Sequence, residues 1–172
     1  MIVRSETVHD FDAIRRVNIE AFKDHPYSRQ TEHLIVEALR VAGALEISLV
    51  AEDGGQVLGH IAFSRATIGD ASRDWFILGP IAVLPEHQGS GIGRALVEAG
   101  LAAIRAHGAA GCVLVGDPAF YNHFGFRQYP GVTCAGVPDE NVLCIPLADD
   151  AVPTGALAHH DAFNVEPEPA EK

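Results

Sequence analysis

The chain lacks long apolar runs and is poor in the residues that build disulfide or metal sites. Across 172 residues no stretch approaches the roughly 18 consecutive apolar residues of a membrane helix, so we expect no membrane association. The first residues have neither the charge nor the apolar core of a signal peptide, which predicts a cytoplasmic location. Three scattered cysteines and histidines without ligand spacing argue against a disulfide framework or a zinc site. We therefore expect no metal.

Basic residues are also scarce. The chain has 12 basic and 23 acidic residues and a formal net charge of −11. An acidic chain without basic clusters is a poor partner for nucleic acid, and we expect none. The same charge mildly favours a cationic substrate. The hydrophobic content of 48% is enough for a packed core, and the length predicts one domain.

Apolar spacing predicts a mixed order of strands and helices. A helix is expected after Asp10, as its capping residue, and a second after Thr31. Asp53-Gly54-Gly55 is a hairpin signal. Pro80 predicts a bulge or break in an apolar strand, because proline removes a ladder donor. The strands are expected at Ile2–Arg4, Ile47–Glu52, Val57–Ala66, Trp75–Leu84, Cys112–Val115, Phe126–Tyr129 and Val142–Leu147. This pattern indicates an α/β or α+β domain with a mixed sheet.

A glycine-rich turn follows the most apolar strand. Gly89, Gly91 and Gly93 are spaced two apart and precede a helix. Glycines allow close backbone approach, and a helix start offers free amides, so together they favour a phosphate cradle. The glycine spacing departs from the dinucleotide-binding pattern, which argues against a dehydrogenase. A Walker loop would need a Gly-Lys-Ser/Thr sequence, and that sequence is absent. A tight strand–helix turn that binds nothing remains an alternative.

Two motifs together carry a family resemblance. Gln88-x-x-Gly91-x-Gly93, followed about thirty residues later by Tyr121-x-x-x-Gly125-Phe126, resembles the GNAT superfamily of acyl-CoA-dependent N-acetyltransferases. The order of elements between residues 1 and 147 is similar to that fold, which has a mixed, mostly antiparallel sheet of six to seven strands flanked by about four helices. The runs around Gly59-His60-Ile61 and Gly116-Asp117-Pro118 resemble a bacterial, YhbS-like branch.

The resemblance implies a set of site residues. In the superfamily, the strand before the turn contacts the pantetheine, the turn amides hold the pyrophosphate, and the tyrosine protonates the leaving thiolate. The implied cofactor-binding residues are Ile81, Ala82, Val83, Gln88, Gly89, Ser90, Gly91, Ile92, Gly93 and Arg94. Tyr121 is the implied general acid, although a half-buried core tyrosine is the alternative interpretation. The loop with His25 and Tyr27 is implied to line the acceptor site, and a plain surface loop is the alternative interpretation.

The general base is open at this point. Some members carry a glutamate on the central strand, whereas Phe76–Ile81 has no carboxylate, and Gly116-Asp117-Pro118 stands where many have an asparagine. His60 is the best candidate, because it lies mid-strand with Ser64 on the same face and has an ordinary pKa of about 6.5. A hydrogen-bonded histidine in a sheet is the plainer interpretation. Asp117 is a second candidate, although capping of a short helix explains it.

The resemblance implies direct transfer of an acetyl group from acetyl-CoA, in a ternary complex, to the amine of a small molecule or a protein. Cys112 lies in an apolar strand, which disfavours an acyl-enzyme. A non-catalytic CoA-binding sensor or regulatory module and a longer acyl-CoA remain alternatives, and a homodimer is left open. We expect the acetyltransferase domain over residues 1–147, a packed extension with a short added strand near Gly155–His159 over 148–164, and a disordered acidic tail over 165–172.

Overall fold

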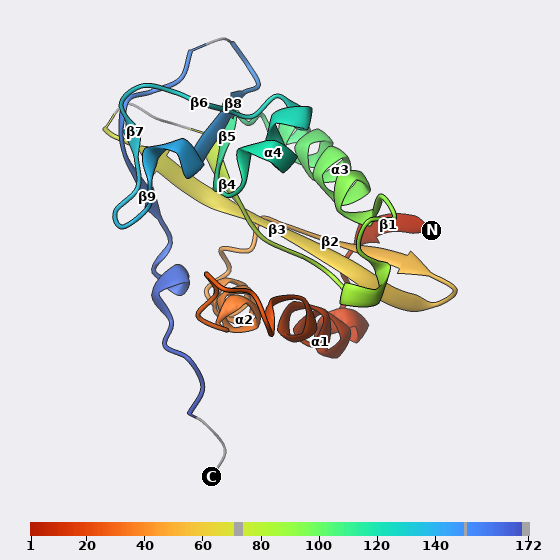
Figure 1. Ribbon diagram of the computed structural model, residues 1–172. Helices are drawn as coiled ribbons and strands as arrows, with labels where there is room; N and C mark the ends of the chain where they lie inside the picture. Colours follow the sequence, from red (N-terminus) through yellow and green to blue (C-terminus); the bar gives the residue numbers. More distant parts are fainter. Residues whose placement is uncertain (71–73, 150, 170–172) are drawn as a thin grey trace.

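The computed structural model describes residues 1–70, 74–149 and 151–169. A twisted sheet forms the middle layer, with α1 and α2 on one face and α3 and α4 on the other (Figure 1). The α-helices in the described residues are α1 (Phe11–Phe22), α2 (Glu32–Val41), α3 (Ile92–Ala106) and α4 (Pro118–Tyr121). No helix in these ranges is long and apolar enough to span a membrane.

The sheet is mixed and mostly antiparallel, which confirms the predicted fold class. Its described strands are β1 (Ile2–Ser5), β2 (Ile47–Asp53), β3 (Gln56–Ile68), β4 (Trp75–Val83), β5 (Gly111–Val115), β6 (Arg127–Gln128), β7 (Val132–Thr133), β8 (Val142–Pro146) and β9 (Gly155–His159). Seven strands follow the order β1-β2-β3-β4-β5-β8-β6. The long strand β3 pairs with β2 up to Phe63 and with β9 from Ala66 onward. The two strands β2 and β9 therefore pair one after the other along β3.

The parallel pair formed by β4 and β5 borders the functional region. β4 and β5 pair only over Trp75–Ile77 and Gly111–Val113, and β4 then continues for six residues to Val83. We call the space between the two strands beyond this pairing the β4–β5 opening. The register between β3 and β4 shifts where Ile61 faces Ile81 and Phe63 faces Leu78. This bulge contains the cis Gly79-Pro80 bond, which confirms the predicted irregularity at Pro80.

The two faces of β3 serve different layers. A Cβ at Gly59 would lie 2.9 Å from Ile92 and one at Gly100 would lie 2.3 Å from Phe63, so helix α3 packs closely on the odd-numbered face of β3. Side chains alternate along a strand. His60 therefore points to the opposite face, where it lies 3.2 Å from Asn18 of α1.

The predicted capping by Asp10 is wrong. Its carboxylate makes no hydrogen bond to the first turn of α1. Instead it accepts two hydrogen bonds from Arg4, at 2.8 and 3.0 Å, and one from the backbone nitrogen of Thr7 at 2.7 Å. A guanidinium on the neighbouring strand outcompetes the helix amides, since charge-assisted bonds are the stronger ones. These bonds tie β1 to the start of α1.

The C-terminal segment crosses from the sheet to the lower helices. After β9 the chain makes a short 3₁₀ turn over Asp161–Asn164 and runs beside α2 (Figure 1). Ala162 is buried against Ile35 and Leu39 of α2, and Phe163 packs against the same cluster. Residues 170–172 of the expected tail lie outside the described residues. The division at about residue 164 therefore stays a prediction.

Candidate active site

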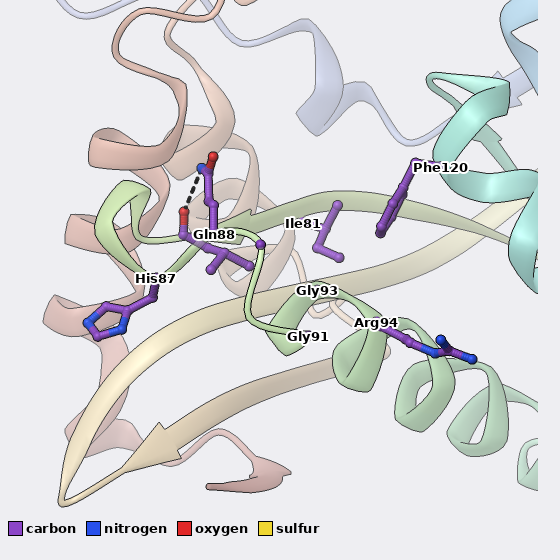
Figure 2. A pocket seen from close by; sticks show the side chains of 9 residues that line it. Ile81, His87, Gln88, Gly91, Gly93, Arg94 and Phe120 are labelled. Atoms are coloured by element: carbon purple, nitrogen blue, oxygen red, sulfur yellow. Dashed lines mark hydrogen bonds between the residues drawn. The ribbon is translucent and has the colours of Figure 1, made fainter.

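A cavity of about 310 Å³ lies between the end of β4, the glycine-rich turn and α4. Figure 2 shows its lining side chains around the turn that leads into α3. The lining residues are Ile81, Val83, His87, Gln88, Gly89, Gly91, Gly93, Arg94 and Phe120. Most residues that the motifs single out therefore meet at one place. Ala82, Ser90 and Ile92 stand beside them in the chain without lining the cavity.

The turn presents free backbone amides to this cavity. Gly89 and Gly91 adopt φ values of 77° and 89°, which side chains rarely tolerate. Gly91 precedes α3 and has no side chain to cap it. The first helical hydrogen bond runs from the Ala95 amide to the Gly91 carbonyl, so the amides of Ile92, Gly93 and Arg94 lack helical partners. This end of the helix favours an anionic group.

The edge of β4 supplies further amides. The Leu84 amide donates to the Leu58 carbonyl of β3 at 2.9 Å. Hydrogen bonding alternates along an antiparallel pair, so the amides of Ile81 and Val83 point to the other edge, toward the β4–β5 opening. The Gln88 side-chain nitrogen donates to the Val83 carbonyl on that edge at 3.1 Å (Figure 2). Gln88 thus fixes the turn against the strand.

Arg94 lies on the first turn of α3. Its Nε donates to Glu98 Oε1 at 3.0 Å, and both side chains are exposed. The guanidinium in Figure 2 points along the helix, away from the turn. An exposed i,i+4 pair is weak. Arg94 is therefore free to exchange this partner for an anion at the cavity.

Tyr121 lies at the C-terminal end of α4, packed between other rings. Its ring centroid is 4.9 Å from that of Phe120 and 5.9 Å from that of Phe126, both in edge-on arrangements. No group in the described residues hydrogen-bonds to its hydroxyl. Burial, and secondarily the nearby Cys112, raises the pKa of Tyr121 to about 12, so the phenol keeps its proton across the physiological range.

Gly116 makes room for this ring. A Cβ at Gly116 would lie 2.5 Å from Tyr121 Cε2. The Gly116 carbonyl accepts a hydrogen bond from the Asn141 side chain at 3.1 Å, and the Gly116 amide donates to the Asn141 carbonyl at 2.9 Å. At Gly116-Asp117-Pro118 the end of β5 is therefore held by Asn141, the residue before β8, and Tyr121 packs against Gly116.

His60 does not reach the cavity. It is fully buried, and burial, followed by the charge of Arg40, lowers its pKa to about 3. The Asn18 amide nitrogen donates to the Ile14 carbonyl at 3.0 Å and directs its second hydrogen to His60 Nδ1. His60 Nε2 therefore carries the proton and donates it to Ser48 Oγ at 2.8 Å. The Ser64 hydroxyl is buried without a hydrogen-bond partner in the described residues.

The other two candidates from the sequence, Asp117 and Cys112, have structural roles. Asp117 accepts a hydrogen bond from the Ala119 amide at 2.9 Å and caps α4 as predicted. Cys112 is fully buried, and burial raises the pKa of its thiol. No group of three or more histidine, cysteine, aspartate or glutamate side chains in the described ranges is arranged to hold a metal ion.

Two residues of the cavity lining, Phe120 and His87, are not predictable from the motifs. Phe120 is 39% exposed and lies 5.3 Å from Phe124, ring to ring, so it forms an apolar wall opposite the glycines. His87 precedes Gln88, and its carbonyl accepts the Ser90 hydroxyl. Their chain positions beside Tyr121 and Gln88 were the only available signals.

Comparison with known proteins decides the family. The chain is 35% identical to the uncharacterized N-acetyltransferase YhbS of Escherichia coli over 152 residues, which cover 85% of this chain and 91% of that one. A model of the acetyltransferase (GNAT) domain matches residues 44–128. The chain belongs to the GNAT acetyltransferase family. A second E. coli relative, the uncharacterized N-acetyltransferase YjhQ, is 32% identical over 78% of this chain and 76% of its own length.

Two solved GNAT structures are similar over nearly the whole chain. A GNAT family acetyltransferase from Brucella melitensis, in complex with acetyl-CoA, is 47% identical with a TM-score of 0.83, covering 94% of this chain and 97% of that one. YhbS from E. coli, in complex with CoA, is 32% identical with a TM-score of 0.86, covering 95% and 92%. The GNAT fold predicted from the two motifs is confirmed.

Proposed function

We propose that this GNAT protein transfers the acetyl group of acetyl-CoA directly to an amine. The observation that carries the proposal is the β4–β5 opening with a glycine-capped helix start at its mouth. The unpaired amides of the turn suit the pyrophosphate, and the free edge of β4 suits the amide-containing pantetheine arm. The binding of acetyl-CoA and CoA by the two similar structures supports the same ligand here.

In this proposal, the attacking nitrogen forms a bond to the thioester carbon and the carbon–sulfur bond then breaks. Negative charge develops first on the carbonyl oxygen, and a β4 amide on the opening edge, Ile81 or Val83, is placed to stabilise it. Each such donor typically contributes roughly 3–4 kcal/mol. The charge then passes to the sulfur, where the protonated Tyr121 hydroxyl donates. With a pKa of about 12, Tyr121 acts first as a hydrogen-bond donor and loses its proton only as the thiolate forms.

The amine must lose a proton before or during attack. We do not assign this step to His60, because its proton-accepting nitrogen is occupied by Asn18. Deprotonation is left to water in this scheme, so the rate should rise with pH toward the pKa of the acceptor amine. An acyl-enzyme is also excluded from the scheme. A buried Cys112 with a raised pKa is a poor nucleophile.

Binding and kinetics test the proposal. Thermal shift with acetyl-CoA, CoA, succinyl-CoA and NAD compares the ligand classes, since a ligand at about 100 times its Kd adds about 2.7 kcal/mol of stability. Acceptors are then screened with lysine, spermidine, tyramine and a lysine-containing peptide. Intersecting initial-velocity lines support direct transfer, and parallel lines with an acetylated protein intermediate contradict it. Binding of acetyl-CoA without turnover of any amine would favour a CoA-binding sensor.

The Tyr121→Phe variant tests the acid. It removes one oxygen and keeps the ring, so acetyl-CoA affinity should be unchanged. We expect kcat to fall by about 10²–10⁴, the usual contribution of a positioned acid, with little change in the KM for acetyl-CoA. A normal kcat would move the role to water or another residue, and lost CoA binding would make Tyr121 structural.

A further inference from the structure

The connection between α1 and α2, residues Lys23–Thr31, lies on the face of the sheet opposite α3 (Figure 1). Helix α1 begins where Asp10 contacts Arg4 of β1, and its middle lies where Asn18 contacts His60 of β3. Eight residues rise about 12 Å, roughly two strand spacings. One more turn brings the helix end over β4, which α1 contacts. The connection therefore begins beside the opening.

This connection is held by short-range contacts, among them the hydrogen bonds of the Ser28 hydroxyl with Glu32 and with the Gln30 amide. Its backbone bonds are short-range: the amide of His25 donates to the Phe22 carbonyl at 3.1 Å, and the amide of Ser28 donates to the His25 carbonyl at 3.2 Å. The Gln30 side chain also donates to the Phe22 carbonyl at 2.7 Å. Tyr27 is 92% exposed and buries almost no surface. Such a segment opens easily unless contacts from outside hold it.

The C-terminal segment provides outside contacts. Beyond Phe163, Glu168 places one carboxylate oxygen 2.7 Å from the Arg15 guanidinium and the other 3.6 Å from His33 Nε2. Glu166 lies 3.3 Å from the guanidinium of Arg29, within the connection itself. These carboxylates thus contact the last part of the connection, the first turn of α2 and the middle of α1.

The contact between Glu168 and His33 differs from an ordinary surface ion pair because His33 is buried. Its side chain is buried at the start of α2, and Nε2 has no hydrogen-bond partner in the described residues. A buried polar atom without a partner is costly, and among the described residues the carboxylate in ion-pair range of this nitrogen is that of Glu168. The hydrogen bond from Arg15 holds the pKa of Glu168 below its usual range, so the carboxylate is charged at neutral pH.

We propose that residues Asp161–Glu168, the C-terminal strap, hold the α1–α2 connection in place on the acceptor side of the opening. Glu168 is the main anchor through Arg15 and His33, and Glu166 fixes the connection directly through Arg29. These are positioning residues and touch neither acetyl-CoA nor the reacting atoms. The link to the acceptor rests on the proposed function and on the family resemblance, which implies that the loop with His25 and Tyr27 lines the acceptor site, whereas the link to the connection rests on neither.

Hydrogen–deuterium exchange of the full chain tests the strap. Glu168→Ala and a chain ending at Val165 should speed exchange in residues 23–31, by about two- to fivefold for each exposed ion pair lost. The matched control is Glu37→Ala, which removes the other partner of Arg15 at 2.7 Å and leaves the strap contacts intact. Unchanged exchange in both strap variants would overturn the proposal, as would an equal rise in the control.

A charge swap separates positioning from general loosening. Arg29→Glu and Glu166→Arg should each speed exchange in the connection, and the double variant should restore it. Failure of the double variant to restore protection counts against the direct contact. With the amine that is acetylated fastest in the acceptor screen, Glu168→Ala should raise the acceptor KM and leave kcat and acetyl-CoA affinity unchanged. A fall in the acetyl-CoA affinity of Glu168→Ala would contradict an acceptor-side role for the strap. If the unsubstituted protein bound no acetyl-CoA, the proposed function would be wrong, whereas the contact between the strap and the connection would still stand.

Discussion

Replacement of Gly116 by alanine should displace the ring of Tyr121, the proposed acid, while its hydroxyl group is retained. The added Cβ would lie 2.5 Å from Tyr121 Cε2 and 3.0 Å from Cδ2, whereas carbon atoms pack at about 3.5–4.0 Å. The backbone of Gly116 is not in the left-handed region, so the obstacles to alanine are this contact and a milder one with Leu114 Cδ1 at 3.1 Å. The ring must therefore move by about 1 Å, a displacement that typically costs a reaction on the order of 10²-fold.

Packing limits how the ring can respond. The Tyr121 ring lies edge-on to two other rings, those of the fully buried Phe126 and of Phe120. Overpacking of this kind costs about 1–3 kcal/mol of stability, so the variant should fold with a lower Tm. We expect kcat to fall about 10- to 100-fold at nearly unchanged acetyl-CoA affinity. The assay is steady-state acetylation beside calorimetric binding.

A double-mutant cycle decides whether the loss passes through Tyr121. In a Tyr121→Phe background the hydroxyl is already absent, so Gly116→Ala should then lower kcat no further. The control is Gly111→Ala, where the Trp75 ring lies 2.4 Å from the added Cβ, away from the cavity; it should lower Tm and leave kcat unchanged. Additive losses in the cycle, or a normal kcat in Gly116→Ala, would refute the reasoning.

Three further outcomes follow from the structure. Gly91→Val forces a β-branched residue to a φ of 89°, and we expect acetyl-CoA affinity, measured by calorimetry, to fall at least about tenfold; unchanged affinity would contradict the assignment of the turn. Deletion of residues 166–172 should lower Tm only slightly, because it removes the ion pairs of Glu166 and Glu168 and no core side chain, and ending the chain at Leu147 should lower Tm much more; equal Tm values would contradict this division. Asp10→Asn should destabilise by about 1–2 kcal/mol at neutral pH. Because Arg4 lowers the Asp10 pKa from 3.8 to about 2, that difference should persist above pH 4 and shrink as the pH falls toward 2, as followed by thermal unfolding.

Local signals were sufficient for much of the fold. Asp53-Gly54-Gly55 predicts the β2–β3 hairpin because both glycines accept positive φ, and they adopt 56° and 80°. The glycine turn likewise predicts the start of α3 and the cavity beside it. Both features depend on backbone conformations that a few adjacent residues determine. Such features are readable from a single chain.

Features that depend on distant partners were not predictable. The two residues of β7, Val132–Thr133, are too few to show a period of two. The pairing of β9 with β3 depends on where β2 ends. Asp10 has the composition of a helix cap, and only the position of Arg4 on the adjacent strand shows that its carboxylate is engaged elsewhere.

Burial separates the two proton carriers that the sequence suggested. It disfavours the charged form of each group, so it raises the pKa of Tyr121 to about 12 and lowers that of His60 to about 3. Because Tyr121 keeps its proton, its hydroxyl can donate a hydrogen bond to the developing thiolate. Because His60 resists protonation, it is a poor proton acceptor, and Asn18 already hydrogen-bonds to its accepting nitrogen. The same desolvation therefore preserves the proposed role of Tyr121 and makes His60 a neutral link between α1 and the sheet.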